Sequence, residues 1–209
     1  MTGNAALGIS LRGLWLAFTN VTLAILSGLF AYAHALNFLR YQRISNFLIV
    51  AKEFLDASFF VARRAPFRTS RHPCHWLVGV AGTFLPLLFR PVDRPCDLVL
   101  GQLLQLLGLI LQVAGILSLN RSFGIVAADR GIKTDGLYRA VRHPLYSSYI
   151  LGHIGYILNN PSLENCVIFV LGTMLQVHRM FIEESFLKHD DAYGEYMKRT
   201  RWRLIPFVF

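Results

Sequence analysis

The residues best suited to chemistry gather in two short stretches near the C-terminal end of a largely apolar chain. The first, KTDGLYRAVRHPLYSSY at 133–149, combines basic side chains, tyrosines and a proline beside an apolar segment. The second, HRMFIEESFL at 178–187, carries Arg179, Glu183 and Glu184 at the end of another apolar segment. Ionisable groups at a membrane boundary usually mark a binding site or an anchor. We therefore expect these two stretches to meet and to hold a small charged ligand.

The first stretch has the features of an anion site. Gly136 permits a tight or left-handed turn, and Pro144 favours the first position of a helix, where its missing N–H costs nothing. A helix that begins near Pro144 directs free N–H groups and a partial positive charge toward the preceding loop. Arg139, Arg142 and His143 add to this positive field. The stretch therefore suits a carboxylate or another anion.

Glu183 and Glu184 offer the opposite chemistry, because carboxylates accept hydrogen bonds from hydroxyl and ammonium groups. A ligand with a carboxylate, an ammonium group, a ribose and a flat base would use both stretches, and S-adenosylmethionine is such a ligand. The alternative is structural: Arg139 and Arg142 would anchor the topology, and Arg179 would pair with Glu183 on one helix face. The residues alone leave both interpretations open.

Composition favours a membrane protein. The chain is 54% hydrophobic and 16% charged, whereas soluble domains carry about 25% charged residues. The net charge is +9, and the basic residues cluster between apolar runs, as in the loops of membrane proteins. We therefore expect no nucleic-acid partner. Cys74, Cys96 and Cys166 have neither disulfide nor zinc spacing, even with His72 and His75 beside Cys74, and we predict no metal site.

Five apolar elements are candidates for crossing or entering a bilayer, whose core needs about 20 apolar residues. They are residues 14–39, 44–62, 76–89, 98–119, and a tight helical hairpin of 146–158 and 163–177 that turns at NNPS. The second element contains Lys52, Glu53 and Asp56. It fits either a span or an interfacial helix. We favour the span, with Lys52 and Asp56 as a structural pair four residues apart.

Basic residues prefer the cytoplasmic side of a membrane. The basic loops at 63–71 and 120–144 and the basic tail predict a cytoplasmic site, with the hairpin tip at 159–164 outside. Arg40 and Arg43 would then lie outside, which keeps an arrangement of four spans open.

The fold prediction is an all-α polytopic membrane protein of about five transmembrane helices, the last pair a tight helical hairpin, with a cytoplasmic cofactor site. We expect a single domain over 1–209. Within it, residues 1–119 would form membrane helices and 120–209 the cofactor-binding catalytic region.

From Thr134 onward the sequence resembles a superfamily of integral-membrane methyltransferases that includes isoprenylcysteine carboxyl methyltransferases and phospholipid N-methyltransferases. The matching pieces stand in the family's order and spacing. They are TDGLYRAVRHPLY (134–146), EESFL (183–187), YGEY (193–196) and RLIP (203–206). The family often has proline at the position of Leu137 and a glycine near Ser147 and Ser148, so the subfamily stays open.

The resemblance implies S-adenosylmethionine as the cofactor, bound between the RHPxY segment and the paired glutamates. The cofactor-binding residues would be Tyr138, Arg142, His143, Pro144, Tyr146, Glu183 and Glu184. The catalytic residues would be Arg203, Glu184 and Tyr146. The tail would fold back over the site through Tyr193, Tyr196, Arg201 and Arg203.

The implied reaction is direct transfer of a methyl group from a sulfonium to a nucleophile, which depends on alignment and on excluding water. The expected partner is a membrane lipid or lipidated acceptor, such as a prenylcysteine carboxylate. A phospholipid or a small amine or thiol is the alternative acceptor. An alternative of another class is a non-catalytic membrane scaffold that retains the fold.

Overall fold

The computed structural model describes residues 11–62, 68–70, 72–93, 97–119, 128–129 and 131–209. Most of the basic loop at 63–71 and part of the connection at 120–144 lie outside these residues. The helices are α1 (Leu11–Tyr41), α2 (Ile44–Ala62), α3 (Pro73–Phe84), α4 (Val99–Leu119), α5 (Pro144–Asn159), α6 (Leu163–Leu187) and α7 (Asp191–Arg199). The 3₁₀ turns are η1 (Leu85–Leu88) and η3 (Gly136–Arg139), and the strands β1 (Arg68–Thr69) and β2 (Ala128–Asp129) pair antiparallel.

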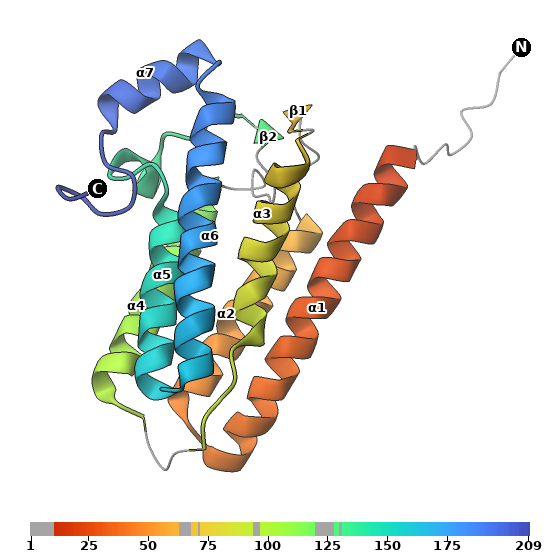
Figure 1. The fold of residues 1–209 in the computed structure, drawn as a ribbon, viewed down its shortest axis with the longest axis vertical. Coiled ribbons are helices and arrows are strands. Elements are labelled where there is room, and N and C mark those ends of the chain that lie inside the picture. The colour runs from red at the N-terminus through yellow and green to blue at the C-terminus, as the bar shows by residue number, and fades with distance from the viewer. Residues whose placement is uncertain (1–10, 63–67, 71, 94–96, 120–127, 130) are drawn as a thin grey trace, which may run out of the picture.

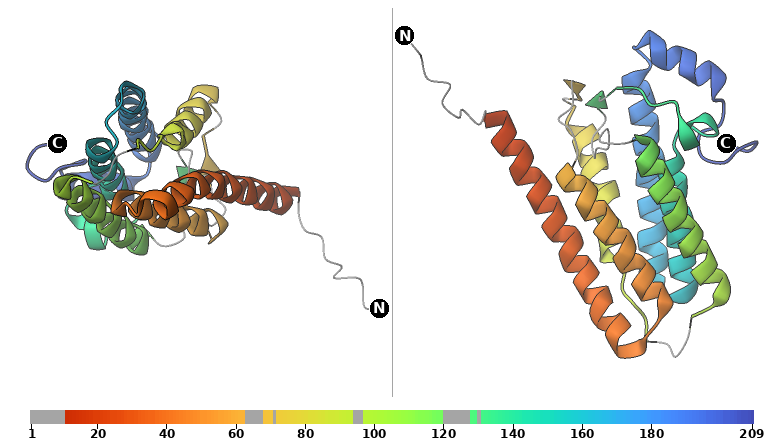
Figure 2. Two further views of the ribbon diagram at one scale, coloured as in Figure 1. Left: turned by 90° about the horizontal axis from the view of Figure 1, so that it is seen from below. Right: turned by 180° about the vertical axis from the view of Figure 1, so that it is seen from behind.

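Helices α1 to α6 run alternately up and down in one bundle, and α7 lies across one end (Figure 1). The start of α1 and the C-terminal tail lie at this α7 end, whereas the α5–α6 turn lies at the opposite end. Helix α1 stands at the edge of the bundle and packs chiefly on α2 (Figure 2).

Within the described residues, three helical segments are long and apolar enough to cross a membrane: Ala17–Tyr41, Val99–Leu119 and Leu163–Leu187. Helix α4 shows why, because it turns a row of large apolar side chains outward: Val99, Leu100, Leu103, Leu106, Leu107, Ile110 and Leu117. The prediction of an all-α membrane fold is confirmed. The number of spans stays a prediction, since α2 carries three charged residues within its apolar run.

The predicted hairpin forms from α5 and α6. Ser162 ends the turn as the N-cap of α6, because its hydroxyl accepts a hydrogen bond from the Asn165 amide at 3.1 Å. Helix α6 continues to Leu187, ten residues beyond the apolar run that ends at Val177. Arg179, Glu183 and Glu184 therefore lie on the last turns of this helix, beyond its apolar part.

Helix α5 packs most extensively on α4, and glycines set the distance between the two backbones. A Cβ at Gly155 would lie 2.5 Å from the Gly101 carbonyl oxygen, and one at Gly108 would lie 2.8 Å from the Gly152 amide nitrogen. Small residues permit this kind of close approach between membrane helices. The contact fixes α5, and with it the motif at its N-terminus.

Arg43 is buried at the end of the bundle opposite α7. Its guanidinium lies 2.7 Å from the Asp97 carboxylate and donates to the Asn159 carbonyl oxygen at 2.6 Å and to the Asn160 side chain at 3.1 Å. This arginine joins the α1–α2 turn to the α5–α6 turn. Its structural role explains a basic residue at the end that the sequence analysis predicts to be outside.

Candidate cofactor site

An open cleft leads from the α7 end into the middle of the bundle. With its solvent-open mouth it encloses about 1340 Å³ of empty space. Its walls come from all seven helices, α1 to α7, and from the turns η1 and η3. Segments distant in sequence therefore contribute side chains to one space.

The turn before α5 is built as the sequence predicts. Gly136 has φ +61°, and a Cβ there would clash with the Ser118 hydroxyl, so glycine is required at this position. Pro144 stands in the first turn of α5, with His143 as the N-cap. The tail pairs with this turn, because the amides of Arg142 and His143 donate to the carbonyl oxygens of Trp202 at 2.8 Å and Arg203 at 2.9 Å, respectively.

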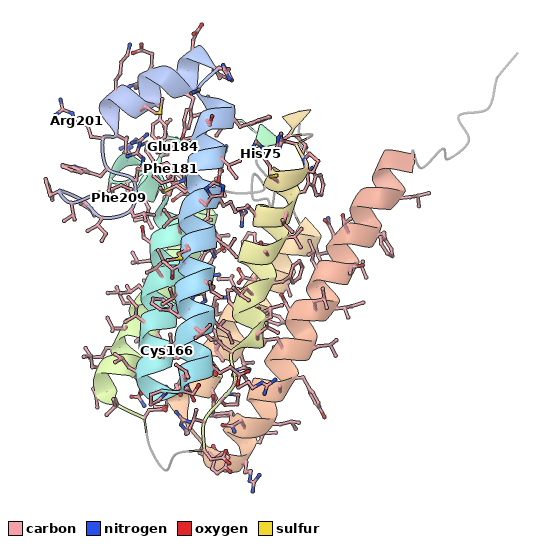
Figure 3. The ribbon with its side chains drawn as sticks, in the orientation of Figure 1. His75, Cys166, Phe181, Glu184, Arg201 and Phe209 are labelled. Carbon is pink, nitrogen blue, oxygen red and sulfur yellow. The ribbon has the colours of Figure 1, made fainter. Side chains whose placement is uncertain are left out.

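Glu184 joins the two stretches. Its Oε1 lies 2.8 Å from Arg142 Nη1 and 3.1 Å from His143 Nε2, and its Oε2 lies 3.1 Å from Arg203 Nε. The side chain is 9% exposed. The expected meeting of the RHPxY segment and the paired glutamates is therefore present in the structure, and Figure 3 shows Glu184 at the α7 end beside the tail.

Glu183 and Tyr146 form a second contact between the stretches. The Tyr146 hydroxyl donates to Glu183 Oε2 at 2.9 Å. Arg179 donates to the Thr83 hydroxyl at 3.2 Å, and its guanidinium carbon lies 5.5 Å from the centroid of the Tyr146 ring. These contacts place a carboxylate, a phenol and a guanidinium next to one another on the cleft.

The proposed site residues divide into two groups. Those on the wall of the cleft are Tyr138, Arg142, His143, Tyr146, Glu183, Tyr193 and Tyr196. Pro144, Glu184 and Arg203 are not part of this wall. Glu184 lies behind Arg142 and His143 and holds them in place, so in this structure it is a positioning residue. Direct contact of Glu184 or Arg203 with a ligand stays a prediction.

The tail closes the α7 end of the site. The Arg203 guanidinium carbon lies 5.3 Å from the Phe181 ring centroid and 5.4 Å from that of Phe209. The Ser147 hydroxyl donates to the Leu204 carbonyl oxygen at 2.6 Å. Arg201 contributes its carbonyl oxygen, which accepts from Arg142 Nη2 at 3.2 Å.

Three tyrosines pack together beneath α7. Tyr138, Tyr193 and Tyr196 form a buried cluster, and the Tyr196 hydroxyl donates to the Tyr138 carbonyl oxygen at 2.8 Å. Burial raises the pKa of Tyr138 well above its usual value, with the nearby Glu183 carboxylate acting in the same direction. The phenol therefore stays neutral at physiological pH and can still donate hydrogen bonds.

The deeper part of the cleft is not predicted as a site from the sequence. Its polar walls are Ser27, Lys52, Glu53, Asp56, His153 and Gln176. The pairing of Lys52 with Asp56 is confirmed at 2.9 Å, but the sequence predicts only a structural role for the pair. The available signal was a third ionisable residue, Glu53, in the same apolar run.

Two buried atoms on the cleft lack hydrogen-bond partners. Across the described part of the chain, the buried side-chain atoms without a partner are Asn46 Oδ1, Arg142 Nε and Gln176 Oε1. Arg142 and Gln176 both line the cleft. One offers a donor and the other an acceptor, so a ligand with groups of both kinds would satisfy them.

Comparison with known proteins finds a matching family model and a solved structure of similar fold. The phospholipid methyltransferase family model matches residues 96–195. A solved structure of the eukaryotic intramembrane Ras methyltransferase, isoprenylcysteine carboxyl methyltransferase, is similar in fold with a TM-score of 0.51. The two chains are 21% identical, and the alignment covers 79% of this chain and 67% of that one. A search of curated proteins finds no match.

The matched region therefore resembles a phospholipid methyltransferase, and the fold resembles that of an intramembrane methyltransferase. The matched range contains α4, α5, α6 and the RHPxY segment, so it includes most of the candidate site.

Proposed function

We propose that this protein transfers a methyl group from S-adenosylmethionine to a lipid-like acceptor that reaches the cleft from the membrane. The observation that carries the proposal is one cleft walled by Arg142, His143, Tyr146 and Glu183. The match to the phospholipid methyltransferase family model supports methyltransferase chemistry. S-adenosylmethionine, when bound, supplies an electrophilic methyl group on a sulfonium.

The residues of the cleft fit the parts of this cofactor. Arg142 is 8% exposed and keeps Nε without a partner, and a ligand carboxylate is a strong acceptor for such a donor. Glu183 can accept hydrogen bonds from hydroxyl or ammonium groups. Tyr138, Tyr193 and Tyr196 offer aromatic surfaces for a flat base.

The protein's own contribution is to align the reactants and exclude water, because direct methyl transfer needs no covalent enzyme intermediate. Glu184 keeps Arg142 and His143 oriented through its two oxygens. The tail, held by Ser147 and Arg203, covers this arrangement from the α7 end.

We also propose that the site faces the cytoplasm. Basic side chains at the α7 end include Lys198 and Arg199 on α7 and Arg201 in the tail (Figure 3), and Lys133 lines the cleft. Loops rich in such residues prefer the cytoplasmic side.

The acceptor is proposed only as a lipid or lipidated molecule. The candidate acceptors are a prenylcysteine carboxylate, a phospholipid, and a small amine or thiol. The rival of another class is a non-catalytic scaffold with the same fold.

Incorporation of label distinguishes these proposals. The purified chain in lipid nanodiscs is incubated with methyl-labelled S-adenosylmethionine and a panel of prenylcysteine, phospholipid, amine and thiol acceptors. We expect label in one extracted acceptor class. The rate should fall about 10-fold or more in Glu184→Gln, because loss of a charge-assisted hydrogen bond costs about 1.5–3 kcal/mol.

Glu195→Gln is the matched control, since the Glu195 side chain is exposed on α7 and pairs with Lys198. Its rate should equal that of the wild type. Cofactor binding without transfer to any acceptor on the panel would favour the scaffold.

A further inference from the structure

The deeper part of the cleft contains a compact charged cluster from α2. Lys52 Nζ lies 2.7 Å from Glu53 Oε1 and 2.9 Å from Asp56 Oδ2. Gln112 of α4 donates to Asp56 Oδ1 at 2.7 Å. Glu53 is 4% exposed and Asp56 8% exposed, and both line the cleft. We call Lys52, Glu53, Asp56 and Gln176 the cleft floor.

The cleft floor carries one ammonium group and two carboxylates, and Lys133, Arg142, Arg179 and Glu183 also line the cleft. Ionisable residues inside a membrane are costly and usually belong to a functional site. The charges of Lys52 and Asp56 already neutralise each other. Glu53 adds a second carboxylate, which the neutrality of that pair does not require.

Gln176 gives an independent indication of a ligand. It lies on α6, is 6% exposed and lines the same cleft. Its Nε2 donates to the Gly82 carbonyl oxygen at 3.4 Å, but its Oε1 is buried without a partner. A buried, unsatisfied acceptor costs about 1–3 kcal/mol. An incoming N–H or O–H group would remove that cost.

Lys52 is already engaged by the protein. Besides the two carboxylates, its ammonium lies 5.6 Å from the centroid of the Tyr149 ring. The remaining capacity of the floor is therefore that of an acceptor: two carboxylates and the Gln176 oxygen.

We infer that the cleft floor binds the polar head of the methyl acceptor, and that this head carries N–H or O–H donors. Glu53, Asp56 and Gln176 are then specificity-determining residues that favour an amine or hydroxyl head over a carboxylate. A carboxylate would meet two like charges and leave Gln176 Oε1 unsatisfied. This inference rests on the proposed function, because it assigns the second substrate of the same cleft.

The test compares three probes that share one tail and differ in the head: octylamine, 1-octanol and octanoate. Each is titrated into the full chain in a nonionic detergent at matched mole fraction, and its affinity is measured by calorimetry. We expect octylamine and 1-octanol to bind at least 10-fold more tightly than octanoate. In Gln176→Met and in Glu53→Gln, octylamine affinity should fall about 3- to 10-fold, as loss of one hydrogen bond predicts.

Gln105→Met is the matched control, since Gln105 is a buried glutamine of α4 that is not part of this cleft and donates to the Ser45 carbonyl oxygen. It should leave octylamine affinity unchanged. Octanoate binding as tight as octylamine binding would overturn the inference. Octylamine binding that is absent, or unchanged in Gln176→Met, would also overturn it.

S-adenosylmethionine is titrated into the same samples. If it fails to bind, the proposed function fails. If S-adenosylmethionine binds but octylamine affinity is the same in the wild type and the floor variants, only the assignment of the cleft floor fails.

Discussion

Glu184 organises a cleft that it does not line. It binds Arg142, His143 and Arg203, which come from the α5 turn and from the tail. Adjacent residues on an α-helix point about 100° apart, so Glu183 and Glu184 face different surroundings. Glu183 lies on the cleft wall, whereas Glu184 is buried behind it. The sequence predicts that both acids belong to the site, but it does not show which one lines the cleft and which one lies behind the wall.

Arg139 and Arg142 of the same motif should also differ in their contribution to cofactor binding. Arg142 is buried and uses Nη1 and Nη2 in separate contacts, whereas Arg139 is exposed and pairs with Asp135 on the surface. A lysine cannot reproduce the planar fork of an arginine. We expect Arg142→Lys to reduce S-adenosylmethionine affinity about 10-fold or more, and Arg139→Lys to leave it unchanged. Calorimetric titration of both variants measures this, and equal affinities would show that the burial of Arg142 is irrelevant to binding.

Helix α5 positions the motif because it packs directly on α4. The closest approach occurs at Gly155, where an added Cβ would meet backbone atoms of α4 at 2.5 and 2.7 Å. Gly152, one turn away on the same helix, has open space at its Cβ position. The sequence predicts both helices, but which glycine faces the partner depends on how the two helices are rotated in the bundle.

This difference between neighbouring glycines gives a matched pair of variants. Gly155→Ala should lower the free energy of unfolding by about 1–3 kcal/mol or more, because the backbones must separate. Gly152→Ala should be neutral or slightly stabilising, since alanine restricts the unfolded chain. Thermal unfolding in a nonionic detergent compares them. Equal melting temperatures would mean that α4 and α5 do not touch at Gly155.

Across the whole molecule, one end carries the site and the other is held by buried polar contacts. Asp97 accepts hydrogen bonds from the Ser45 amide at 2.8 Å and the Ser45 hydroxyl at 2.7 Å, and it pairs with Arg43. Burial alone would raise the pKa of the Asp97 carboxyl, but the Ser45 bonds and Arg43 outweigh it and lower the pKa. This carboxylate therefore stabilises the fold in its ionised form.

The lowered pKa determines the pH dependence. The stabilisation is complete above the unfolded-state pKa of about 3.9 and is lost as the pH falls through the lower folded-state value. Asp97→Asn should be less stable than the wild type by about 3–5 kcal/mol at pH 7, because it leaves Arg43 buried without its partner.

Melting temperatures measured from pH 7 down through the unfolded-state pKa test this expectation. The variant should lose less stability on acidification than the wild type, and its S-adenosylmethionine affinity at pH 7 should be unchanged. Parallel pH curves for the two proteins would contradict this role of Asp97.

The orientation in the membrane can be measured with two native cysteines. Cys74 and Cys166 are both exposed free thiols. Cys74 lies in the first turn of α3, toward the α7 end, and Cys166 lies at the opposite end (Figure 3). A cytoplasmic site predicts that a membrane-impermeant maleimide added to intact cells labels a single-cysteine variant with Cys166 but not one with Cys74. The reverse pattern would place the site outside.

Much of the architecture follows from the sequence, because apolar length and turn residues specify the helices and the α5–α6 hairpin. The order of the RHPxY and glutamate pieces also predicts that they meet. The cleft floor could not be predicted, since the spacing of Lys52 and Asp56 fits a lipid-shielded pair as well as a cleft wall. The burial of Arg43 likewise depends on Asp97 and on the α5–α6 turn, which only the folded bundle brings together.

The central claim is that Arg142, His143, Tyr146 and Glu183 enclose an S-adenosylmethionine site. Equilibrium titration of S-adenosylmethionine into the purified chain tests it most directly, with Glu183→Gln as the variant and Glu195→Gln as the control. We predict saturable binding at one site, an affinity about 10-fold or more lower in Glu183→Gln, and no change in the control. Absence of binding to the wild type, or equal affinity in Glu183→Gln, would contradict the claim.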